Sequence, residues 1–207
     1  MTHGFDKDFW ERHWRQAGGS MGGDPPNPYL AHETGDLTPG TALDAGCGTG
    51  AEAIWLASQG WHVTAADIAS EALTRAAGRA AASGSPESVR WVEADLGVWS
   101  PDAPFDLVMT HYAHPAMPQL EFYDRIAGWV APGGTLLIVG HLQTPDSTGH
   151  GHHPPADVSA TAASITARMD RREWQVVTAE EHLRTLTGHG DRAAPLHDVV
   201  VRATRRR

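Results

Sequence analysis

Short apolar segments suited to β-strands alternate with segments in which apolar residues recur at helical spacing. The expected strands span residues 41–44, 61–67, 89–95, 105–111, 135–141, 174–180 and 196–204. The expected helices span residues 6–16, 28–33, 70–83, 118–130 and 157–170, with a further helix that begins after Gly50. This alternation predicts an α/β fold built on one sheet.

The connections between the expected strands indicate how the sheet is assembled. Where helices connect the strands, right-handed crossovers predict parallel neighbours and a doubly wound, mostly parallel sheet. Residues 181–195 carry no long helical pattern, so the last two strands can be antiparallel neighbours joined by this loop-rich segment. A length of 207 residues without a repeat or linker predicts a single domain spanning 1–207.

The first expected helix is rich in aromatic residues. Phe5, Phe9, Trp10 and Trp14 recur at helical spacing, and a glycine-rich connection follows at residues 18–23. We therefore interpret residues 1–35 as a helical lid and expect residues 1–24 to become more ordered when a ligand binds, with Trp10 or Trp14 lining the site. Permanent packing of the helix on the domain surface is the alternative.

The loop after the first expected strand is the most informative stretch of the sequence, Asp44-Ala45-Gly46-Cys47-Gly48-Thr49-Gly50. Glycines let the backbone turn sharply off a strand and approach a ligand closely, and the following helix offers unpaired N–H groups. Gly46, Gly48 and Ala51 also satisfy the dinucleotide fingerprint. A nicotinamide-dependent oxidoreductase is therefore an alternative, although no Tyr-x-x-x-Lys constellation accompanies the glycines.

Acidic residues and histidines stand where the expected strands end, namely Asp44, Asp67, Asp95, His111 and His141. Ligands of open α/β sheets bind beyond the carboxyl ends of the strands, so these side chains are the first candidates for a site. Asp67 stands 17 residues after Gly50, where a carboxylate can accept hydrogen bonds from both ribose hydroxyls. A cap for the next helix is the competing role of Asp67.

The glycine-rich loop closely resembles the first motif of class I S-adenosylmethionine-dependent methyltransferases. Three further features resemble the small bacterial tellurite-resistance and thiopurine methyltransferase group: Phe9-Trp10-Glu11-Arg12, Asn27-Pro28, and the turn at residues 129–134. The resemblance implies a Rossmann-like seven-stranded sheet with an antiparallel C-terminal strand. It also implies S-adenosyl-L-methionine as cofactor and S-adenosyl-L-homocysteine as product.

The resemblance further implies roles for individual residues. The loop would cradle the methionine and ribose parts of the cofactor, Asp95 would lie beside the adenine amino group, and Ile68 and Leu96 would lie near the adenine ring. The full set of cofactor-binding candidates is Trp14, Asp44, Gly46, Cys47, Gly48, Gly50, Asp67, Ile68, Asp95, Leu96 and His111.

The segment after the fourth strand carries the catalytic candidates His111, Tyr112 and His114. Methyl transfer from a sulfonium requires alignment and exclusion of water more than a fixed catalytic group. A base is needed only when the acceptor must lose a proton, and His111 would then serve for a phenol. We expect a small acceptor with a soft or easily ionised sulfur, oxygen or nitrogen nucleophile; a non-catalytic cofactor-binding protein is a further alternative.

Composition limits the partners and the compartment. A formal net charge of −9 argues against nucleic acid or an anionic membrane as a partner. One cysteine, Cys47, permits no internal disulfide and suits the cytoplasm. We expect a monomer or homodimer. The histidines of residues 150–153 lack the completing ligands of a zinc site, so we expect a solvated loop and no metal.

Overall fold

The computed structural model describes residues 5–16, 25–84, 88–142, 160–187 and 193–207. Its helices are α1 (Lys7–Gln16), α2 (Pro28–Thr34), α3 (Ala51–Ser58), α4 (Ser70–Ser83), α5 (Gln119–Ala127) and α6 (Ala162–Thr166). Its strands are β1 (Thr41–Ala45), β2 (His62–Asp67), β3 (Val89–Glu93), β4 (Phe105–His111), β5 (Val130–His141), β6 (Trp174–Thr187) and β7 (Ala193–Arg205).

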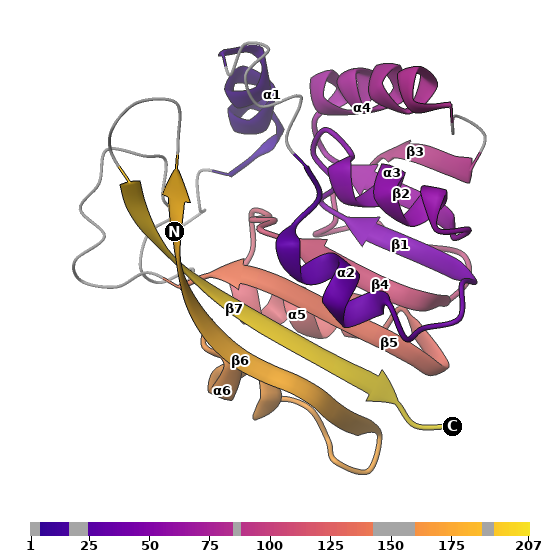
Figure 1. Ribbon diagram of the computed structural model, residues 1–207, viewed down its shortest axis with the longest axis vertical. Helices are drawn as coiled ribbons and strands as arrows, with labels where there is room; N and C mark the ends of the chain where they lie inside the picture. The colour runs from indigo at the N-terminus through magenta and orange to yellow at the C-terminus, as the bar shows by residue number, and fades with distance from the viewer. Residues whose placement is uncertain (1–4, 17–24, 85–87, 143–159, 188–192) are drawn as a thin grey trace.

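These strands form one seven-stranded sheet in the order β3-β2-β1-β4-β5-β7-β6 (Figure 1). The strands β1 to β5 are parallel, whereas β7 runs antiparallel to both of its neighbours. The predicted α/β class, doubly wound sheet and antiparallel C-terminal strand are therefore confirmed. The strand order reverses between β1 and β4, which is the point where such sheets bind their ligands.

Helices cover both faces of the sheet and divide the core into two layers (Figure 1). On one face, Leu30 of α2 and Leu56 of α3 are fully buried against β1, β2 and β4. On the other, Phe122 and Ile126 of α5 and Ile165 of α6 pack against β4, β5 and β7. The central strands are apolar on both faces because both faces are covered, which is why they were recognisable as uninterrupted apolar runs.

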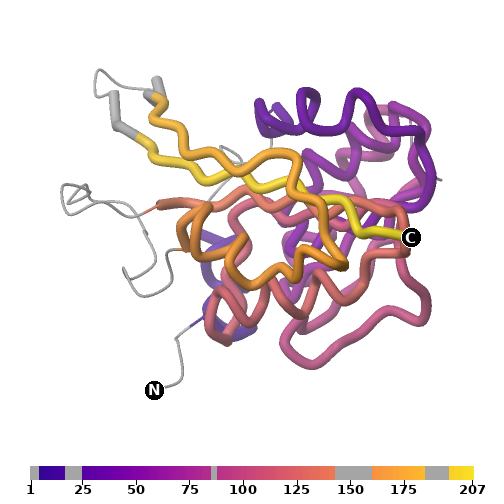
Figure 2. The backbone as a smooth tube through the Cα atoms, turned by 90° about the horizontal axis from the view of Figure 1, so that it is seen from below, coloured from indigo at the N-terminus to yellow at the C-terminus, as the bar shows by residue number. Residues whose placement is uncertain are grey.

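Four predicted boundaries are wrong. Residues 181–187 and 193–195 belong to strands rather than to a loop, because β6 and β7 pair from Trp174↔Arg205 to Thr187↔Ala193, with one register shift between Val176 and Thr178. Figure 2 shows the orange and yellow tubes of this pair continuing past the helices. The strand was not predicted beyond residue 180 because Glu180 and Glu181 interrupt the apolar pattern. Strand β6 lies at the sheet edge, where most of its described side chains are exposed, so it does not require an apolar run.

The remaining corrections concern helix ends and one strand start. The helix expected over 118–130 ends at Ala127, because β5 already begins at Val130 and pairs there with Phe105. That strand consequently starts earlier than the expected residue 135. The helix expected over 157–170 is only Ala162–Thr166 among the described residues, with Thr161 accepting from the Ser164 N–H as its N-cap.

The loop after β1 requires its glycines for two different reasons. Gly46, Gly48 and Gly50 all have positive φ, which glycine adopts without steric cost. In addition, a Cβ on Gly46 would lie 2.3 Å from the Cβ of Ala113. The chain after β4 therefore crosses directly over the start of the loop, and only a residue without a side chain fits between them.

Substitution of Gly46 tests this close approach. We expect Gly46→Ala to lower the free energy of unfolding by about 2–4 kcal/mol, because it adds a left-handed backbone penalty to an overlap with Ala113. Gly78→Ala is the matched control: Gly78 lies inside α4 with open space around its Cα, so the change should stabilise by about 0.5–1 kcal/mol. Equal urea-unfolding midpoints for the two variants would contradict the proposed crowding.

Candidate active site

The glycine-rich loop is held by bonds to the end of β2. Gly46 and Cys47 both donate their N–H groups to the carbonyl of Ala66, at 2.8 and 3.0 Å. Gly48 donates its N–H to Oδ2 of Asp67 at 2.8 Å. The loop then ends at Gly50, which takes the N-cap position of α3. Two adjacent strands therefore fix the path of the loop.

Asp44 is buried directly beneath this loop, with 1% of its surface exposed. Its Oδ2 atom has no hydrogen-bond partner among the described residues. Burial raises the pKa of the Asp44 carboxyl well above its usual range, and the neighbouring carboxylates Glu52 and Asp67 raise it further. Buried polar atoms are nearly always satisfied, so this oxygen marks a place where a ligand group would complete the structure.

Asp67 performs the capping role and also faces the loop. Its Oδ1 accepts a hydrogen bond at 2.9 Å from the N–H of Ala69, the N-cap residue of α4. Its Oδ2 accepts from the N–H of Gly48. Burial raises the pKa of the Asp67 carboxyl, although its backbone hydrogen bonds oppose that rise. Each oxygen keeps lone-pair capacity for a further donor.

The other cofactor candidates occupy positions around the same end of the sheet. Asp95 is exposed after β3, and its Oδ1 accepts from the N–H of Gly97. Ile68 is half-buried beside Asp67, whereas Leu96 is buried in the core layer that contains α5. Cys47 is buried, and burial raises the pKa of its thiol, so the thiol stays protonated.

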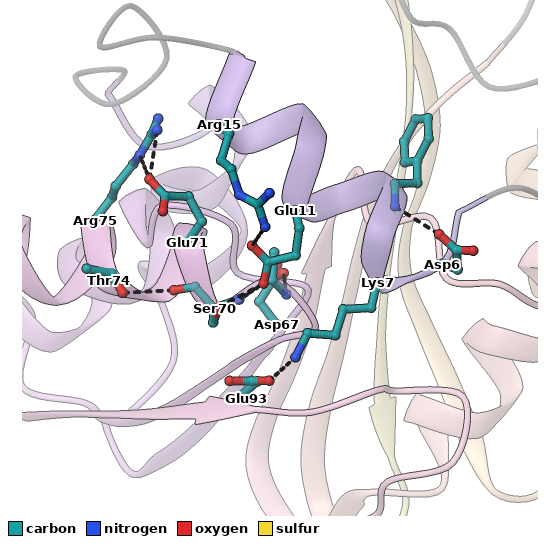
Figure 3. A network of polar contacts seen from close by, with 12 residues as sticks. Asp6, Lys7, Glu11, Arg15, Asp67, Ser70, Glu71, Thr74, Arg75 and Glu93 are labelled. Carbon is teal, nitrogen blue, oxygen red and sulfur yellow. Dashed lines mark hydrogen bonds and ion pairs between the residues drawn. The ribbon is translucent and has the colours of Figure 1, made fainter.

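Helix α1 packs across this end of the sheet (Figure 3). The buried carboxylate of Glu11 accepts from both the N–H and the hydroxyl of Ser70 at 2.8 Å, at the start of α4. Lys7 pairs with Glu93 at the end of β3. Trp14 lies against the loop itself, because a Cβ on Gly48 would be 3.1 Å from the Trp14 ring.

The aromatic face of α1 also contacts the segment after β4. Trp10 donates its Nε1–H to the carbonyl of His114 at 3.3 Å, and the ring of Phe5 lies 5.9 Å from that of His114. The described part of the expected lid therefore lies over the strand ends. Residues 1–4 and 17–24 lie outside the described residues, so ordering on ligand binding stays a prediction.

His111 and His114 carry buried ring nitrogens. His111 ends β4 with 9% of its surface exposed, and neither ring nitrogen has a hydrogen-bond partner in the part of the chain that the structure describes. His114 bonds Gln119 through Nδ1 at 3.0 Å. Burial lowers the pKa of both imidazoles, so both are neutral at neutral pH.

Tyr112 is held by a network rather than left facing open space. Its backbone φ of 57° is the positive value of a non-glycine residue, a strained conformation. Its hydroxyl donates to Asp198 at 3.1 Å and accepts from Asn27 at 3.0 Å and Arg184 at 2.9 Å. Its ring stacks on His141 with centroids 3.9 Å apart.

Sequence reasoning missed the centre of this network, Asp198. The Asp198 side chain is fully buried on β7 and accepts from Arg184 at 2.5 Å and from Tyr29 at 3.2 Å, besides Tyr112. Burial raises the pKa of the Asp198 carboxyl, but interactions with His141, Arg184 and Tyr112 outweigh this effect and lower it overall. The available signal was a single carboxylate at the start of the apolar run Val199–Val201, which is a costly residue to bury unpaired.

Comparison with known proteins identifies the protein family to which this chain belongs. Residues 42–134 match a family model described as a methyltransferase domain. The chain is 30% identical over 158 residues to probable thiol methyltransferase 2 of Arabidopsis thaliana, covering 73% of this chain and 68% of that protein. It is also 30% identical to trans-aconitate 2-methyltransferase of Streptomyces avermitilis, covering 73% and 57% respectively.

The chain belongs to the class I S-adenosylmethionine-dependent methyltransferases. Among solved structures, TehB of Haemophilus influenzae superimposes with a TM-score of 0.71 at 14% identity, over 87% of this chain and 62% of that one. The N-methyltransferase NodS of Bradyrhizobium japonicum, in complex with S-adenosylhomocysteine, gives 0.69 at 18%, over 96% and 97%. The predicted class I methyltransferase family is confirmed, and the likeness to TehB is one of fold.

The site of this methyltransferase suits S-adenosylmethionine, which is its cofactor. The loop offers a surface that a Cβ would fill, and the unpartnered oxygen of Asp44 lies under it. Asp67 ends β2, and Asp95 follows the end of the neighbouring strand β3 by two residues. Family membership thus decides between the two cofactors that the glycines alone left open.

Two further features of the methyltransferase concern alternatives raised by composition. Within the described ranges, no helix is long and apolar enough to cross a membrane. The same ranges contain no group of three or more His, Cys, Asp or Glu side chains that suits a metal ion. The segment His150–His153, which raised the metal question, lies outside the described residues.

The contact between Glu11 and Ser70 predicts a pH-dependent attachment of α1. Hydrogen bonds from Ser70 lower the pKa of the Glu11 carboxyl, so its contribution is present above the unfolded value of about 4.3 and is lost as pH falls through the folded value. At neutral pH we expect Glu11→Gln to weaken the protection of α1 amides by about 1–3 kcal/mol in hydrogen exchange.

The difference between wild type and Glu11→Gln should shrink as pH is lowered to about 4 and below, because protonation removes the same charge in the wild type. Asp8→Asn, an exposed change on the same helix, is the control and should leave the exchange of α1 nearly unaltered. A constant difference between the two proteins at every pH would contradict the assignment to the Glu11 carboxylate.

Proposed function

We propose that this methyltransferase acts on a small molecule whose accepting atom is a soft or easily ionised sulfur, oxygen or nitrogen. The observation that carries the proposal is the position of α1. Its aromatic face lies over His114 and the glycine-rich loop, so the strand ends are covered by one helix of the same chain. A covered site of this kind suits a small acceptor. The likeness to a thiol methyltransferase supports a soft nucleophile.

The cofactor side of the proposal uses the residues around the loop. Gly46, Gly48 and Gly50 allow close approach, and the Asp44 carboxyl would accept from a donor of the methionine part. Asp67 would accept from the ribose hydroxyls. Cys47 lies within the loop as a buried residue. Asp95, Ile68 and Leu96 would hold the adenine, and Trp14 would lie above the loop.

The acceptor side of the proposal uses His111, Tyr112 and His114. When bound, S-adenosylmethionine supplies an electrophilic methyl group on a sulfonium. The described residues align and shield the reacting atoms: positioning contributes several kcal/mol of the barrier, and α1 excludes water. Neutral His111 and His114 avoid like-charge repulsion with the sulfonium. The aromatic rings of α1 favour a cation by their faces.

The proposal includes the cellular setting. The negative net charge favours a small-molecule acceptor over nucleic acid or a membrane surface. A single buried cysteine suits the cytoplasm. We further propose that the enzyme acts as a monomer or homodimer.

Removal of Asp67 tests the cofactor assignment. We expect Asp67→Ala to weaken S-adenosylhomocysteine binding by about 2–4 kcal/mol in calorimetric titration, because two hydrogen bonds to a charged acceptor are lost. Asp67→Asn, which retains one acceptor oxygen, should lose less. Asp102→Ala, an exposed change far along the chain, is the control. A folded Asp67→Ala protein with unchanged affinity would refute the ribose role.

A panel of acceptors tests the reaction itself. Turnover of S-adenosylmethionine should be observed with at least one small thiol, phenol, carboxylate or inorganic anion, and the site residues predict a preference for the thiol. His111→Ala should lower kcat/KM with the preferred acceptor. Binding of S-adenosylhomocysteine without turnover on any member of the panel would count against a small soft acceptor.

A further inference from the structure

The end of β5 places an imidazole beside a buried carboxylate. Nδ1 of His141 lies 3.4 Å from Oδ1 of Asp198, whose side chain is fully buried. The His141 side chain keeps 22% of its surface exposed, so its imidazole lies between the buried Asp198 carboxylate and solvent. A carboxylate in this position favours the tautomer with the proton on Nδ1, which leaves Nε2 as a proton acceptor.

The same imidazole lies among the residues already placed at the site. Its ring is stacked on Tyr112 within 13° of parallel, which fixes the plane of the ring. Ala113 follows Tyr112 and lies over Gly46 of the cofactor loop. His114 is close enough for the charge of His141 to lower its pKa. His141 therefore contacts Tyr112 directly and lies near His114, which are two of the candidate acceptor contacts.

We propose that His141, oriented by Asp198, accepts the proton of the methyl acceptor, which makes weakly acidic thiols and phenols the substrate class of this enzyme. The inference rests on the proposed function, because it concerns the acceptor of that reaction. Asp198 is a positioning residue: it acts through His141 and Tyr112. Sequence reasoning had assigned the proton to His111.

The proposed step balances in atoms and charge. Nε2 of His141 takes the proton from the sulfur or oxygen of the acceptor, and that atom uses the released electron pair to form a bond with the methyl carbon. The bond from this carbon to the sulfonium sulfur breaks with both electrons left on sulfur, giving the neutral thioether. The imidazolium then returns its proton to water through its exposed edge.

The surroundings favour His141 over the other two histidines. No carboxylate contacts the ring of His111 among the described residues, and burial disfavours its charged form. His114 uses Nδ1 to bond the neutral amide of Gln119. By contrast, His141 faces Asp198 of β7, and the groups that share this carboxylate are Tyr112, Arg184 of β6 and Tyr29 of α2.

Arg184 offsets part of the Asp198 charge, so the carboxylate acts chiefly by orientation. The Arg184 guanidinium binds Asp198 and also the Tyr112 hydroxyl, which ties the stacked ring pair to β6. Orientation of a base by a third group is the usual arrangement where a side chain must accept a proton. An apo distance of 3.4 Å is compatible with a bond that tightens when substrate binds.

Two thiols that differ in ionisation test the proposal. Phenylmethanethiol is an alkyl thiol and is mostly protonated at neutral pH, whereas 4-nitrothiophenol is already a thiolate. We expect His141→Asn to lower kcat/KM at pH 7 by roughly 10²–10⁴-fold for phenylmethanethiol and by less than about 3-fold for 4-nitrothiophenol. Activity of the variant on phenylmethanethiol should recover as pH rises and the thiol ionises.

The control is His62→Asn, an exposed substitution at the opposite end of the sheet, which should leave both thiols unaffected. His111→Asn should lower kcat/KM for both thiols by a similar factor, as expected of a side chain that only contacts the acceptor. Asp198→Asn should lower kcat/KM for phenylmethanethiol more than kcat/KM for 4-nitrothiophenol. The double variant Asp198→Asn with His141→Asn should have the same kcat/KM as His141→Asn alone. If Asp198→Asn fails to fold, the two-thiol comparison on His141→Asn decides the proposal by itself.

Three results would overturn the proposal. His141→Asn could retain full activity on both thiols, or lose both equally, or the wild type could turn over neither thiol. Each differs from failure of the proposed function, in which the wild type would turn over no member of the wider acceptor panel. Calorimetry with S-adenosylhomocysteine completes the separation, since His141→Asn should bind it as the wild type does.

Discussion

The hydrogen bond from the Gly48 N–H to Asp67 is the contact on which the cofactor side of this methyltransferase depends. It joins the loop after β1 to the end of β2, beside the two N–H groups that bind the Ala66 carbonyl. Because the loop has positive φ at three glycines, its path is set by these few bonds rather than by side-chain packing. Every other element of the site is placed with respect to that path, including Ala113 above Gly46 and Trp14 beside Gly48.

The two sides of the site are built by different physical means. The cofactor side consists of backbone donors and carboxylates close together in sequence, within β1, its loop and the end of β2. The acceptor side that we propose is assembled from α2, the segment after β4, β5, β6 and β7 around one buried carboxylate, Asp198. Removing one partner from such a buried cluster leaves the others unpaired, so its members act as a unit.

This difference explains what the sequence could and could not predict. The loop and the places of β1 to β5 along the chain follow from glycine spacing and buried apolar runs, which are local signals. The hub at Asp198 was missed because its partners Tyr29 and Tyr112 are separated from it by long stretches of chain, and neither carries a local signal that points to Asp198. Asn27 was read only as the start of α2, a role it does have, since it accepts from the Tyr29 N–H.

The strained backbone of Tyr112 has a consequence for how the enzyme matures during synthesis. Asn27 is made early, Tyr112 midway and Asp198 in the last strand of the sheet, so the left-handed residue lacks its stabilising anion until β7 pairs with β5. Contacts between such distant segments form slowly, because the intervening chain must first be ordered. A growing chain therefore completes the half of the sheet with the glycine-rich loop first, and the network around Asp198 is assembled only when the final strand is in place.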